Sequence, residues 1–358
     1  MKKLNLISQL GLLVTAVIAM GCGKASNSFS TLPTGQSFKQ VASFNNQLDI
    51  LWVVDNSGSM QPYQDNLTAN FNSFISSFVG KGYDFKIAVT GTDAFRGDST
   101  LSGYNSNNAN LARFRDGYFS NSGIFVILPT TPNINNVFLT NARLGVNGTG
   151  DERAFSSFRT SLNSNLNAGF LRPNSFLAII ILSDEDDFSG NGRCVNCGSY
   201  QSYTASTLDS VQSYVNFLDQ KTNSSGATRR YNVSNISVID NQCLSQNQGS
   251  GSIMGTRYMQ LTQATGGVSG SICSASYATT LNQIQNQISE LSTQFFLTQT
   301  PIVSTIVVIV NGVRIANDVV NGWTYDASAN SIVFHGTSIP PQGADISIDF
   351  IPASLTGN

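Results

Sequence analysis

The spacing of apolar residues predicts strands that alternate with helices from about residue 47 to residue 296. Ile50–Val54 and Phe176–Ser183 are continuous apolar runs, typical of strands buried on both faces of a parallel sheet. Further strand-like runs are Tyr83–Thr90 and Val233–Asp240, and helical spacing of apolar residues occurs in Gln64–Val79, Ala154–Leu162, Thr207–Gln220 and Tyr277–Phe295. This alternation predicts an α/β fold with a doubly wound, mostly parallel sheet.

The pattern changes after residue 296, where the helical period disappears. Three short strand-like runs follow, at Thr305–Val310, Ser331–His335 and Asp345–Ile351. Turn sequences such as Asn311-Gly312 separate them. Residues 297–358 are therefore predicted to form a small antiparallel β domain, in which we see no catalytic chemistry.

Composition is consistent with two folded domains. The chain has 358 residues, of which 41% are hydrophobic and only 11% charged, so packed cores are expected and most of the surface must be uncharged and polar. Nineteen basic residues against 21 acidic ones give a net charge of −2. Because nucleic-acid binding depends on positive charge, this balance argues against a nucleic acid as partner.

The first residues are typical of a signal peptide, which we assign to residues 1–21. Lys2 and Lys3 precede the apolar stretch Leu10–Met20, which is shorter than the roughly 20 residues that a membrane-spanning helix needs. The polar stretch Ser26–Gly35 indicates a flexible tether, and residues 22–46 are assigned to it.

The end of this segment, Ile18 to Cys22, resembles the lipobox of bacterial lipoproteins. That resemblance implies that Cys22 becomes the lipidated first residue of the mature chain, in the bacterial cell envelope. Gly23 stands where an Asp would suggest retention at the inner membrane, so the outer membrane is the predicted destination. The alternative is an ordinary secretory signal with a Cys at this place by chance.

The first apolar run ends in an array of short oxygen side chains, Asp55, Ser57 and Ser59. They lie just past the carboxyl end of a predicted central strand, where open α/β sheets bind their ligands. A hard divalent cation is the natural occupant of such a site. The alternatives are a plain polar turn and a phosphotransferase of the haloacid dehalogenase type, but Ser57 stands where that enzyme needs a second acid.

Two later segments carry side chains of the same chemistry. Asp184 follows the second apolar run directly, and Thr149 lies between Gly148 and Gly150 in a loop before a predicted helix. Glycines on both sides would let the backbone bring Thr149 close to the first loop. The competing interpretation is that Thr149 or Asp151 caps the helix that follows.

Taken together and in this order, these blocks resemble the von Willebrand factor type A domain with its metal-ion-dependent adhesion site, over about Gln47 to Gln294. The run Thr265-Gly266-Gly267 is similar to the sequence that leads into this family's last strand. The resemblance implies a metal-binding domain over residues 47–296 and a Mg²⁺ ion, with Mn²⁺ or Ca²⁺ as alternatives. It also implies a partner protein that offers an Asp or Glu carboxylate to the metal. The implied metal ligands are Asp55, Ser57, Ser59, Thr149 and Asp184.

Three further acids follow Asp184, where family members often have Gly. Glu185, Asp186 and Asp187 make this loop more negative than the pattern requires. We interpret them as a solvated acidic turn, with a second cation site as the alternative.

Apart from Cys22 the chain has four cysteines, and an even number in an exported protein indicates disulfides. A zinc site or a redox motif at Cys194 and Cys197 is the alternative. With the strands placed as above, Cys243 and Cys273 both follow strands at the carboxyl edge of the sheet, so we expect them to pair. Cys194 and Cys197 are then left to pair locally.

No catalytic set is evident, because the only histidine is His335 and neither a His-Glu-x-x-His nor a phosphate-binding glycine-lysine loop occurs. We expect His335 to be structural and the chain not to be an enzyme. The predicted function is that of a membrane-anchored envelope lipoprotein that uses a cation to recognise a protein ligand. The alternative is a periplasmic assembly scaffold whose metal is structural.

Overall fold

The computed structural model describes residues 38–43, 47–80, 82–190, 206–224, 229–247, 252–341 and 343–355. The predicted signal peptide, Cys22, most of the predicted tether, and Cys194 and Cys197 lie outside the described residues. None of the helices in the described ranges is both long enough and apolar enough to cross a membrane.

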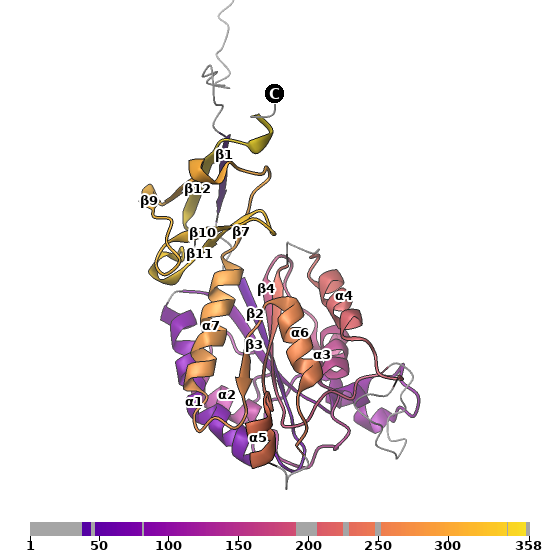
Figure 1. Ribbon diagram of the computed structural model, residues 1–358. Helices are drawn as coiled ribbons and strands as arrows, with labels where there is room; N and C mark the ends of the chain where they lie inside the picture. The colour runs from indigo at the N-terminus through magenta and orange to yellow at the C-terminus, as the bar shows by residue number, and fades with distance from the viewer. Residues whose placement is uncertain are drawn as a thin grey trace, which may run out of the picture. The chain divides into compact units, whose positions relative to one another are not determined.

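A five-stranded sheet organises the larger part of the chain (Figure 1). Its strands lie in the order β3-β2-β4-β5-β6, and every neighbouring pair is parallel. The strands are β2 (Gln47–Val54), β3 (Asp84–Gly91), β4 (Phe176–Leu182), β5 (Tyr231–Ser237) and β6 (Ser269–Ser271). The alternation predicted from the sequence is therefore confirmed as a mixed α/β fold with a parallel sheet, and the chain turns back through a helix or a long connection after each strand.

Helices cover both faces of this sheet (Figure 1). Apolar side chains of β2 point alternately to the two faces: Ile50, Trp52 and Val54 belong to one core, Leu51 and Val53 to the other. This is why β2 reads as an unbroken apolar run. The helices are α1 (Gln61–Gly80), α2 (Ile134–Ala142), α3 (Ala154–Asn163), α4 (Val211–Lys221), α5 (Asn241–Gln246), α6 (Thr256–Thr265) and α7 (Ala278–Ser292).

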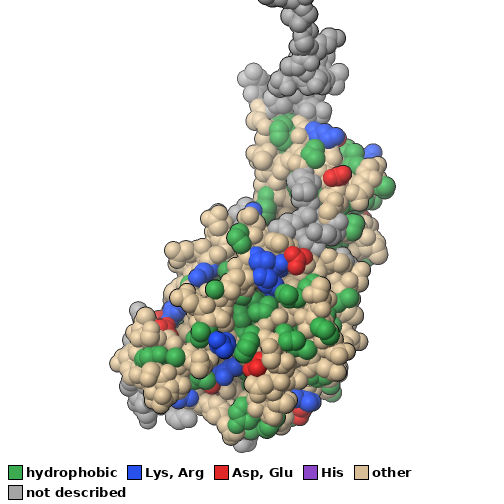
Figure 2. Space-filling view, turned by 180° about the vertical axis from the view of Figure 1, so that it is seen from behind, with side chains coloured by type: hydrophobic (Ala, Val, Ile, Leu, Met, Phe, Trp, Pro, Cys, Tyr) green, Lys and Arg blue, Asp and Glu red, His purple; other side chains and the backbone are tan. Residues whose placement is uncertain are grey.

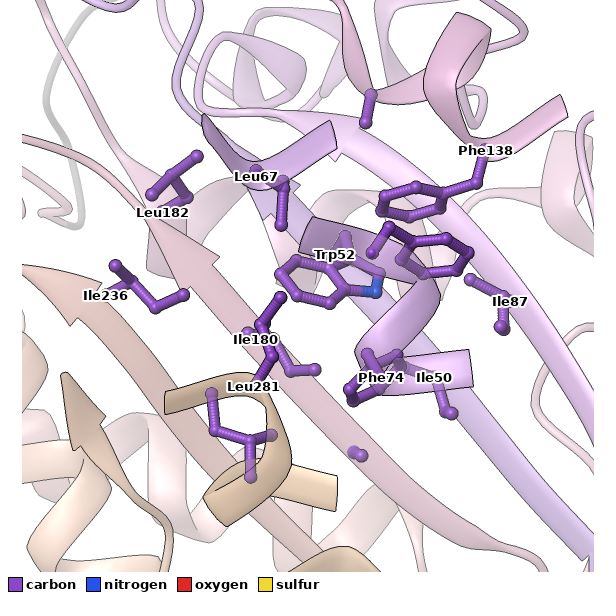
Figure 3. Packing of buried hydrophobic residues seen from close by; sticks show 14 of the residues in the cluster. Ile50, Trp52, Leu67, Phe74, Ile87, Phe138, Ile180, Leu182, Ile236 and Leu281 are labelled. Atoms are coloured by element: carbon purple, nitrogen blue, oxygen red, sulfur yellow. The ribbon is translucent and has the colours of Figure 1, made fainter. Parts of the chain in front are cut away.

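The core between the sheet and helices α1, α2 and α7 is built around Trp52 (Figure 3). Its indole meets Phe74 of α1 edge to face at 5.4 Å and Phe138 of α2 at 5.6 Å, while Leu281 of α7 belongs to the same cluster. Such aromatic pairs contribute about 0.5–1.5 kcal/mol each beyond the burial of apolar area. Since Trp52 precedes Asp55 by three residues, this packing fixes the strand from which the candidate site begins.

The opposite face of the sheet has its own core, built from α3, α4 and α6. Phe155 of α3 lies 5.0 Å from Tyr214 of α4 and 5.6 Å from Tyr258 of α6, measured between ring centres. All three side chains are fully buried. The start of α3, which follows the Gly-Thr-Gly loop, is thereby held against two other helices.

The C-terminal residues, together with residues 38–43, form two antiparallel sheets with a shared apolar core that includes Trp323, Phe334 and Phe350. One sheet has the order β1-β12-β8-β9 and the other β10-β11-β7. Their strands are β1 (Phe38–Ser43), β7 (Phe295–Phe296), β8 (Val307–Val310), β9 (Val313–Ile315), β10 (Trp323–Asp326), β11 (Ser331–Phe334) and β12 (Asp345–Phe350). The antiparallel β structure predicted after residue 297 is present, and the short β7 precedes that boundary.

One part of the predicted tether is not a tether. Residues 38–43 form β1, which pairs with β12 in the register Phe38 to Phe350 through Ser43 to Asp345. The rings of Phe38 and Phe350 lie 5.3 Å apart. The strand escaped sequence analysis because its hydrogen-bonding partner lies at the other end of the chain.

The surface agrees with the low content of charged residues. In the view of Figure 2 most of the surface is uncharged polar side chain or backbone, with Lys, Arg, Asp and Glu side chains scattered among it. Apolar side chains are also visible on this face.

Candidate metal centre

Two buried aspartates meet where β2 and β4 end. Asp55 follows β2 and Asp184 lies two residues beyond β4, and both side chains are fully buried. The Asp55 N–H donates to the carbonyl of Leu182 at 2.9 Å, which holds the two strand ends in register. The parallel pairing of β2 with β4 therefore delivers both carboxylates to one edge of the sheet.

Hydroxyl groups of the first loop join these two acids. Ser59 donates to Asp184 Oδ1 at 3.1 Å, and the Ser57 and Ser59 hydroxyls lie 3.4 Å apart. The backbone N–H of Ser57 donates to Asp55 Oδ1 at 2.8 Å. Four of the five side chains singled out in the sequence are thus neighbours in the folded chain.

The fifth, Thr149, is placed differently. Its hydroxyl accepts a hydrogen bond from the Asp151 N–H at 3.1 Å, and within the described ranges we find none from Thr149 to the other four side chains. The loop itself does approach the first one, since the Gly148 N–H donates to the Asn56 carbonyl at 2.7 Å. A Cβ atom at Gly148 would lie 2.6 Å from that carbonyl oxygen, so the predicted reason for a glycine here is confirmed.

Glu152, three residues further on, is a side chain that sequence reasoning missed. It is fully buried, and neither carboxyl oxygen makes a hydrogen bond of normal geometry in the described structure, although Ser57 and Asp55 lie near enough to act on its charge. Burial, and then the charges of Asp55, Glu185 and Asp184, raise the pKa of Glu152 well above its usual range, with a partial offset from Ser57. An isolated acid at a helix entry has no periodicity or spacing that could reveal this orientation.

Other polar groups complete the surroundings of Asp55. Ser183 donates to Asp55 Oδ2 at 2.7 Å, and Thr92, which follows β3, donates to Asp55 Oδ1 at 3.3 Å. The side-chain amide of Gln64 on α1 bridges the Asp55 carbonyl at 2.8 Å and the Gly145 carbonyl at 2.9 Å. Thr92 and Ser183 could have been proposed from the sequence, because both directly follow strands at this edge.

The electrostatics of the site are those of acids held together. Burial, then the charge of Asp184, raises the pKa of Asp55 to about 6, although hydrogen bonds from Ser57 and Ser183 and the nearby Glu152 carboxyl lower it. Burial also raises the pKa of Asp184, against hydrogen bonds from Ser59 and Ser252. Elsewhere buried aspartates have arginine partners, as in Asp49 with Arg172 and Asp187 with Arg257. Among the described residues no Lys, Arg or His pairs with Asp55, Glu152 or Asp184.

These donors fit a hard cation. They are oxygen atoms only, the type of ligand that Mg²⁺ and Ca²⁺ take, and the Glu152 carboxyl adds a buried acid that has no ion-pair partner among the described residues. Among the described residues, no group of three or more His, Cys, Asp or Glu side chains is placed so that it could hold a metal ion by itself. Any cation here would therefore depend on the serine hydroxyls, water, or a small rearrangement of the carboxylates.

Of the three acids after Asp184, Glu185 is half-buried, and the prediction of a solvated turn was wrong for Asp186 and Asp187. Asp186 and Asp187 are buried, and both face α6. Asp186 accepts the backbone N–H of Arg257 at 3.0 Å, while Asp187 pairs with the Arg257 guanidinium at 3.1 Å. Asp187 also accepts the N–H of Phe155 at 3.0 Å, at the start of α3, where neither Thr149 nor Asp151 acts as cap.

The contacts of Asp186 and Asp187 do not support the alternative of a second cation site either. The positive partner of Asp187 is Arg257, a residue of the chain itself. Burial raises the pKa of Asp186 to about 7, with hydrogen bonds from the backbone of Asp187 and Arg257 opposing the increase. These two acids connect the loop after β4 to α3 and α6.

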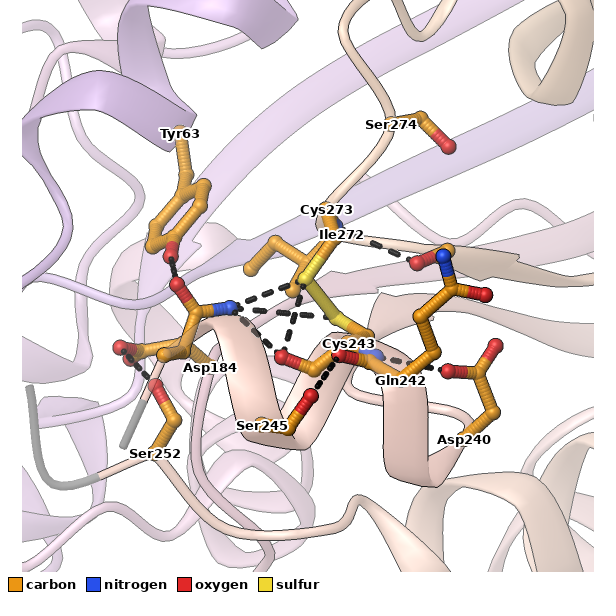
Figure 4. The surroundings of a disulfide bond; sticks show 12 residues. Tyr63, Asp184, Asp240, Gln242, Cys243, Ser245, Ser252, Ile272, Cys273 and Ser274 are labelled. Carbon is orange, nitrogen blue, oxygen red and sulfur yellow. Dashed lines mark hydrogen bonds between the residues drawn. A yellow bond between two sulfur atoms is a disulfide. The ribbon is translucent and has the colours of Figure 1, made fainter.

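The predicted pairing of Cys243 with Cys273 is confirmed (Figure 4). The Cα atoms are 5.5 Å apart, and the bond joins the start of α5 to the segment after β6 across 30 residues. Closing a loop of this length stabilises a fold by about 3–4 kcal/mol on chain entropy. Figure 4 also shows Ser252, beyond α5, donating to Asp184, so the disulfide lies beside one rim of the site.

Comparisons with known proteins add little to this picture. No family model and no curated protein matches the sequence. Among solved structures, the pilus adhesin SpaC from Lactobacillus rhamnosus GG in its open conformation is 15% identical, with a TM-score of 0.41, over 90% of this chain and 41% of that chain. Proximal thread matrix protein 1 from the mussel byssus is 11% identical, with a TM-score of 0.38, over 73% of this chain and 52% of that chain. The chain thus spans about half or less of the length of these structures, and at such scores the likeness says nothing about what it binds.

Proposed function

We propose that the chain binds a divalent cation at the carboxyl edge of its parallel sheet and uses it to recognise another protein. The observation that carries this proposal is the burial of Asp55, Glu152 and Asp184 in one place without a positive partner among the described residues. Buried charges in proteins are paired or coordinate metals. The arginine partners of Asp49 and Asp187 indicate that this chain otherwise follows the rule.

The side chains that would hold the cation are Asp55, Ser57, Ser59 and Asp184, with Thr149 as the fifth ligand implied by the family resemblance. Mg²⁺ is the first choice, and Mn²⁺ or Ca²⁺ are alternatives, because all donors are oxygens. When bound, such an ion supplies a concentrated positive charge that attracts an anionic oxygen. An Asp or Glu carboxylate of a partner protein is the group that the resemblance implies.

Metal binding is tested by the stability of the purified protein with Mg²⁺ or Mn²⁺ against EDTA. At a hundredfold excess over the dissociation constant, the ion should raise the unfolding free energy by about 2.7 kcal/mol. The double variant Asp55→Ala, Ser57→Ala should lose this gain while its circular dichroism spectrum stays that of the parent. Asp98→Ala, on an exposed loop, is the matched control and should keep the gain. Equal calorimetric titrations of parent and double variant would refute the proposal.

A second candidate is a periplasmic assembly scaffold in which the metal is structural. The observation that favours it is that Asp55, Glu152 and Asp184 are all fully buried, which leaves the partly exposed Ser59 as the nearest group for a partner. The two functions differ in where the protein is displayed. Labelling of intact cells by antibody supports recognition outside the cell, and labelling only after the envelope is opened supports the scaffold.

We further propose that the chain is lipid-anchored in the bacterial cell envelope, in the outer membrane, through Cys22. The support is the lipobox resemblance of the residues before it. Cys22→Ser should move the protein from the membrane fraction to the soluble fraction. If the variant still sediments with membranes and palmitate never labels the parent, the anchor is elsewhere.

We propose no enzymatic activity. His335, the only histidine, receives or donates a hydrogen bond at 2.7 Å with Thr324 and lies 3.4 Å from Glu290, so its two ring nitrogens are both engaged. It lies directly after β11, in the C-terminal β structure. The cation site itself is surrounded by hydroxyls and carboxyls.

A further inference from the structure

Glu152 occupies a position that packing alone does not explain. A fully buried carboxyl group that makes no hydrogen bond of normal geometry in the described structure is costly for a fold, because burial removes the water that would solvate it. Its neighbours make the cost larger, since Asp55, Glu185 and Asp184 are all acidic. A cation among these acids would remove the cost.

The backbone on both sides holds Glu152 in this place. Its carbonyl accepts the Phe188 N–H at 2.9 Å, from the loop after β4, and the next N–H, that of Arg153, donates to the Thr92 carbonyl at 3.3 Å, from the loop after β3. These two hydrogen bonds hold Glu152 between the loop after β4, which carries Asp184, and the loop after β3, which carries Thr92.

The adjacent charges do not neutralise Glu152. Arg153 pairs with Asp151 through two hydrogen bonds, and its guanidinium lies 4.3 Å over the ring of Phe95. Asp151 is therefore the acid that pairs with Arg153, while the charges that act on the carboxyl of Glu152 are those of Asp55, Glu185 and Asp184.

We propose that Glu152, and not Thr149, is the residue through which the loop before α3 holds the cation, either directly or through one bound water. The inference rests on the proposed cation site and changes its composition. With Asp55, Glu152 and Asp184 the site carries three negative groups, so a bound divalent cation leaves it with a net charge of −1. The cation is then retained by the chain alone, and a carboxylate from a partner has to compete with Glu152 for it.

The experiment titrates Mg²⁺ and Ca²⁺, each alone, into the full chain by calorimetry. Glu152→Gln keeps the shape and removes the charge, and it should raise the dissociation constant tenfold or more. Thr149→Val tests the competing assignment and should change the constant by less than twofold. Glu290→Gln, the same substitution on α7, controls for the loss of one glutamate and should behave like the parent.

Stability in EDTA separates a metal role from a structural one. Without metal, Glu152→Gln should melt no lower than the parent, because it replaces a buried acid, surrounded by other acids, with a neutral side chain of the same shape. If this variant fails to fold, Glu152→Asp is measured instead, and it should bind more weakly because its carboxylate is held one methylene shorter.

Each outcome is decisive. Tenfold weaker binding by Thr149→Val with unchanged binding by Glu152→Gln would overturn the assignment and leave the cation site intact. A lower melting temperature of Glu152→Gln in EDTA, with unchanged affinity, would make Glu152 purely structural. If the parent chain binds neither Mg²⁺ nor Ca²⁺, the proposed function itself is refuted.

Discussion

Strand β2 carries a buried aspartate near each end, and the two are treated very differently. Asp49, near its start, accepts the Arg172 N–H at 2.7 Å, the Ser175 hydroxyl at 2.5 Å and an ion pair from the Arg172 guanidinium at 2.8 Å. Asp55, just past its end, faces Asp184 and Glu152 instead. Both side chains are fully buried.

The pKa shifts describe the same contrast. Burial raises the pKa of Asp49, and every other neighbour that acts on it, Ser175 and Arg172, lowers it. At Asp55 burial is followed by a second increase from the charge of Asp184. Both Asp49 and Asp55 are thus buried. Asp49 has a counter-charge from the chain itself, Arg172, whereas Asp55 has none among its described neighbours. The amino end is complete by itself, and the carboxyl end is suited to a cation from solution.

The largest expected effect is the loss of stability when Asp49, at the amino end of β2, is replaced. Asp49→Ala leaves the partly buried Arg172 without its main partner, and breaking a buried pair in this way costs about 3–5 kcal/mol. Because Arg172 still pairs with Asp84, we expect the lower end of that range. Urea unfolding should show this loss equally in Mg²⁺ and in EDTA. Asp84→Ala, which removes the half-exposed partner, should cost less than about 1 kcal/mol; a larger loss there than in Asp49→Ala would reverse our ranking of the two acids.

The second effect is a pH dependence of the carboxyl end in EDTA. The folded pKa of Asp55 is raised to about 6 from 3.8, so the folded chain holds this proton more tightly than the unfolded chain does. Stability from this source is fully present below pH 4 and is lost as pH rises through about 6, by roughly 2 to 3 kcal/mol. Asp55→Asn should flatten the curve of unfolding free energy against pH by that amount. Parallel curves for parent and variant between pH 4 and 7 would contradict the assignment.

The smallest effect concerns the approach of the loop before α3. Gly148→Ala places a methyl group 2.6 Å from the Asn56 carbonyl oxygen, and we expect a loss of about 1–3 kcal/mol from the forced shift. The gain from Mg²⁺ should shrink as well, because this loop carries Glu152. Gly80→Ala, where a Cβ meets nothing within 4 Å, is the control and should lose nothing. If Mg²⁺ raises the unfolding free energy of both variants equally, the loop before α3 has no part in binding the cation.

Much of the sheet and part of the site could be predicted from the sequence. Asp55 and Asp184 end apolar runs, and parallel strands bring their carboxyl ends to one edge whatever the loops do. The serines follow at alternate positions in the same short loop. The pairing of Cys243 with Cys273 was accessible for the same reason, since both lie after strands at that edge.

The remaining features depend on partners far away in the sequence. Asp187 is buried because Arg257, seventy residues later, reaches it, and no local pattern announces that contact. Which of Thr149 and Glu152 faces the acids depends on the path of a loop without periodicity. Half of residues 38–43 are polar, and their status as a strand depends on β12.

That distant pairing bears on how the chain is made. The residues of β1 leave the ribosome about 310 residues before those of β12, an interval of roughly 15 to 60 s at typical rates of synthesis. During this time β1 has no strand beside it, whereas all residues from β2 to α7 have already been synthesised. Helices that connect parallel strands run back across the sheet, so the end of α7 returns to the edge from which β2 started. Once the residues from β2 to α7 fold, the two ends of this segment lie close together. The pairing of β12 with β1 then closes a short gap instead of a loop of some 300 residues, and its entropic cost is smaller.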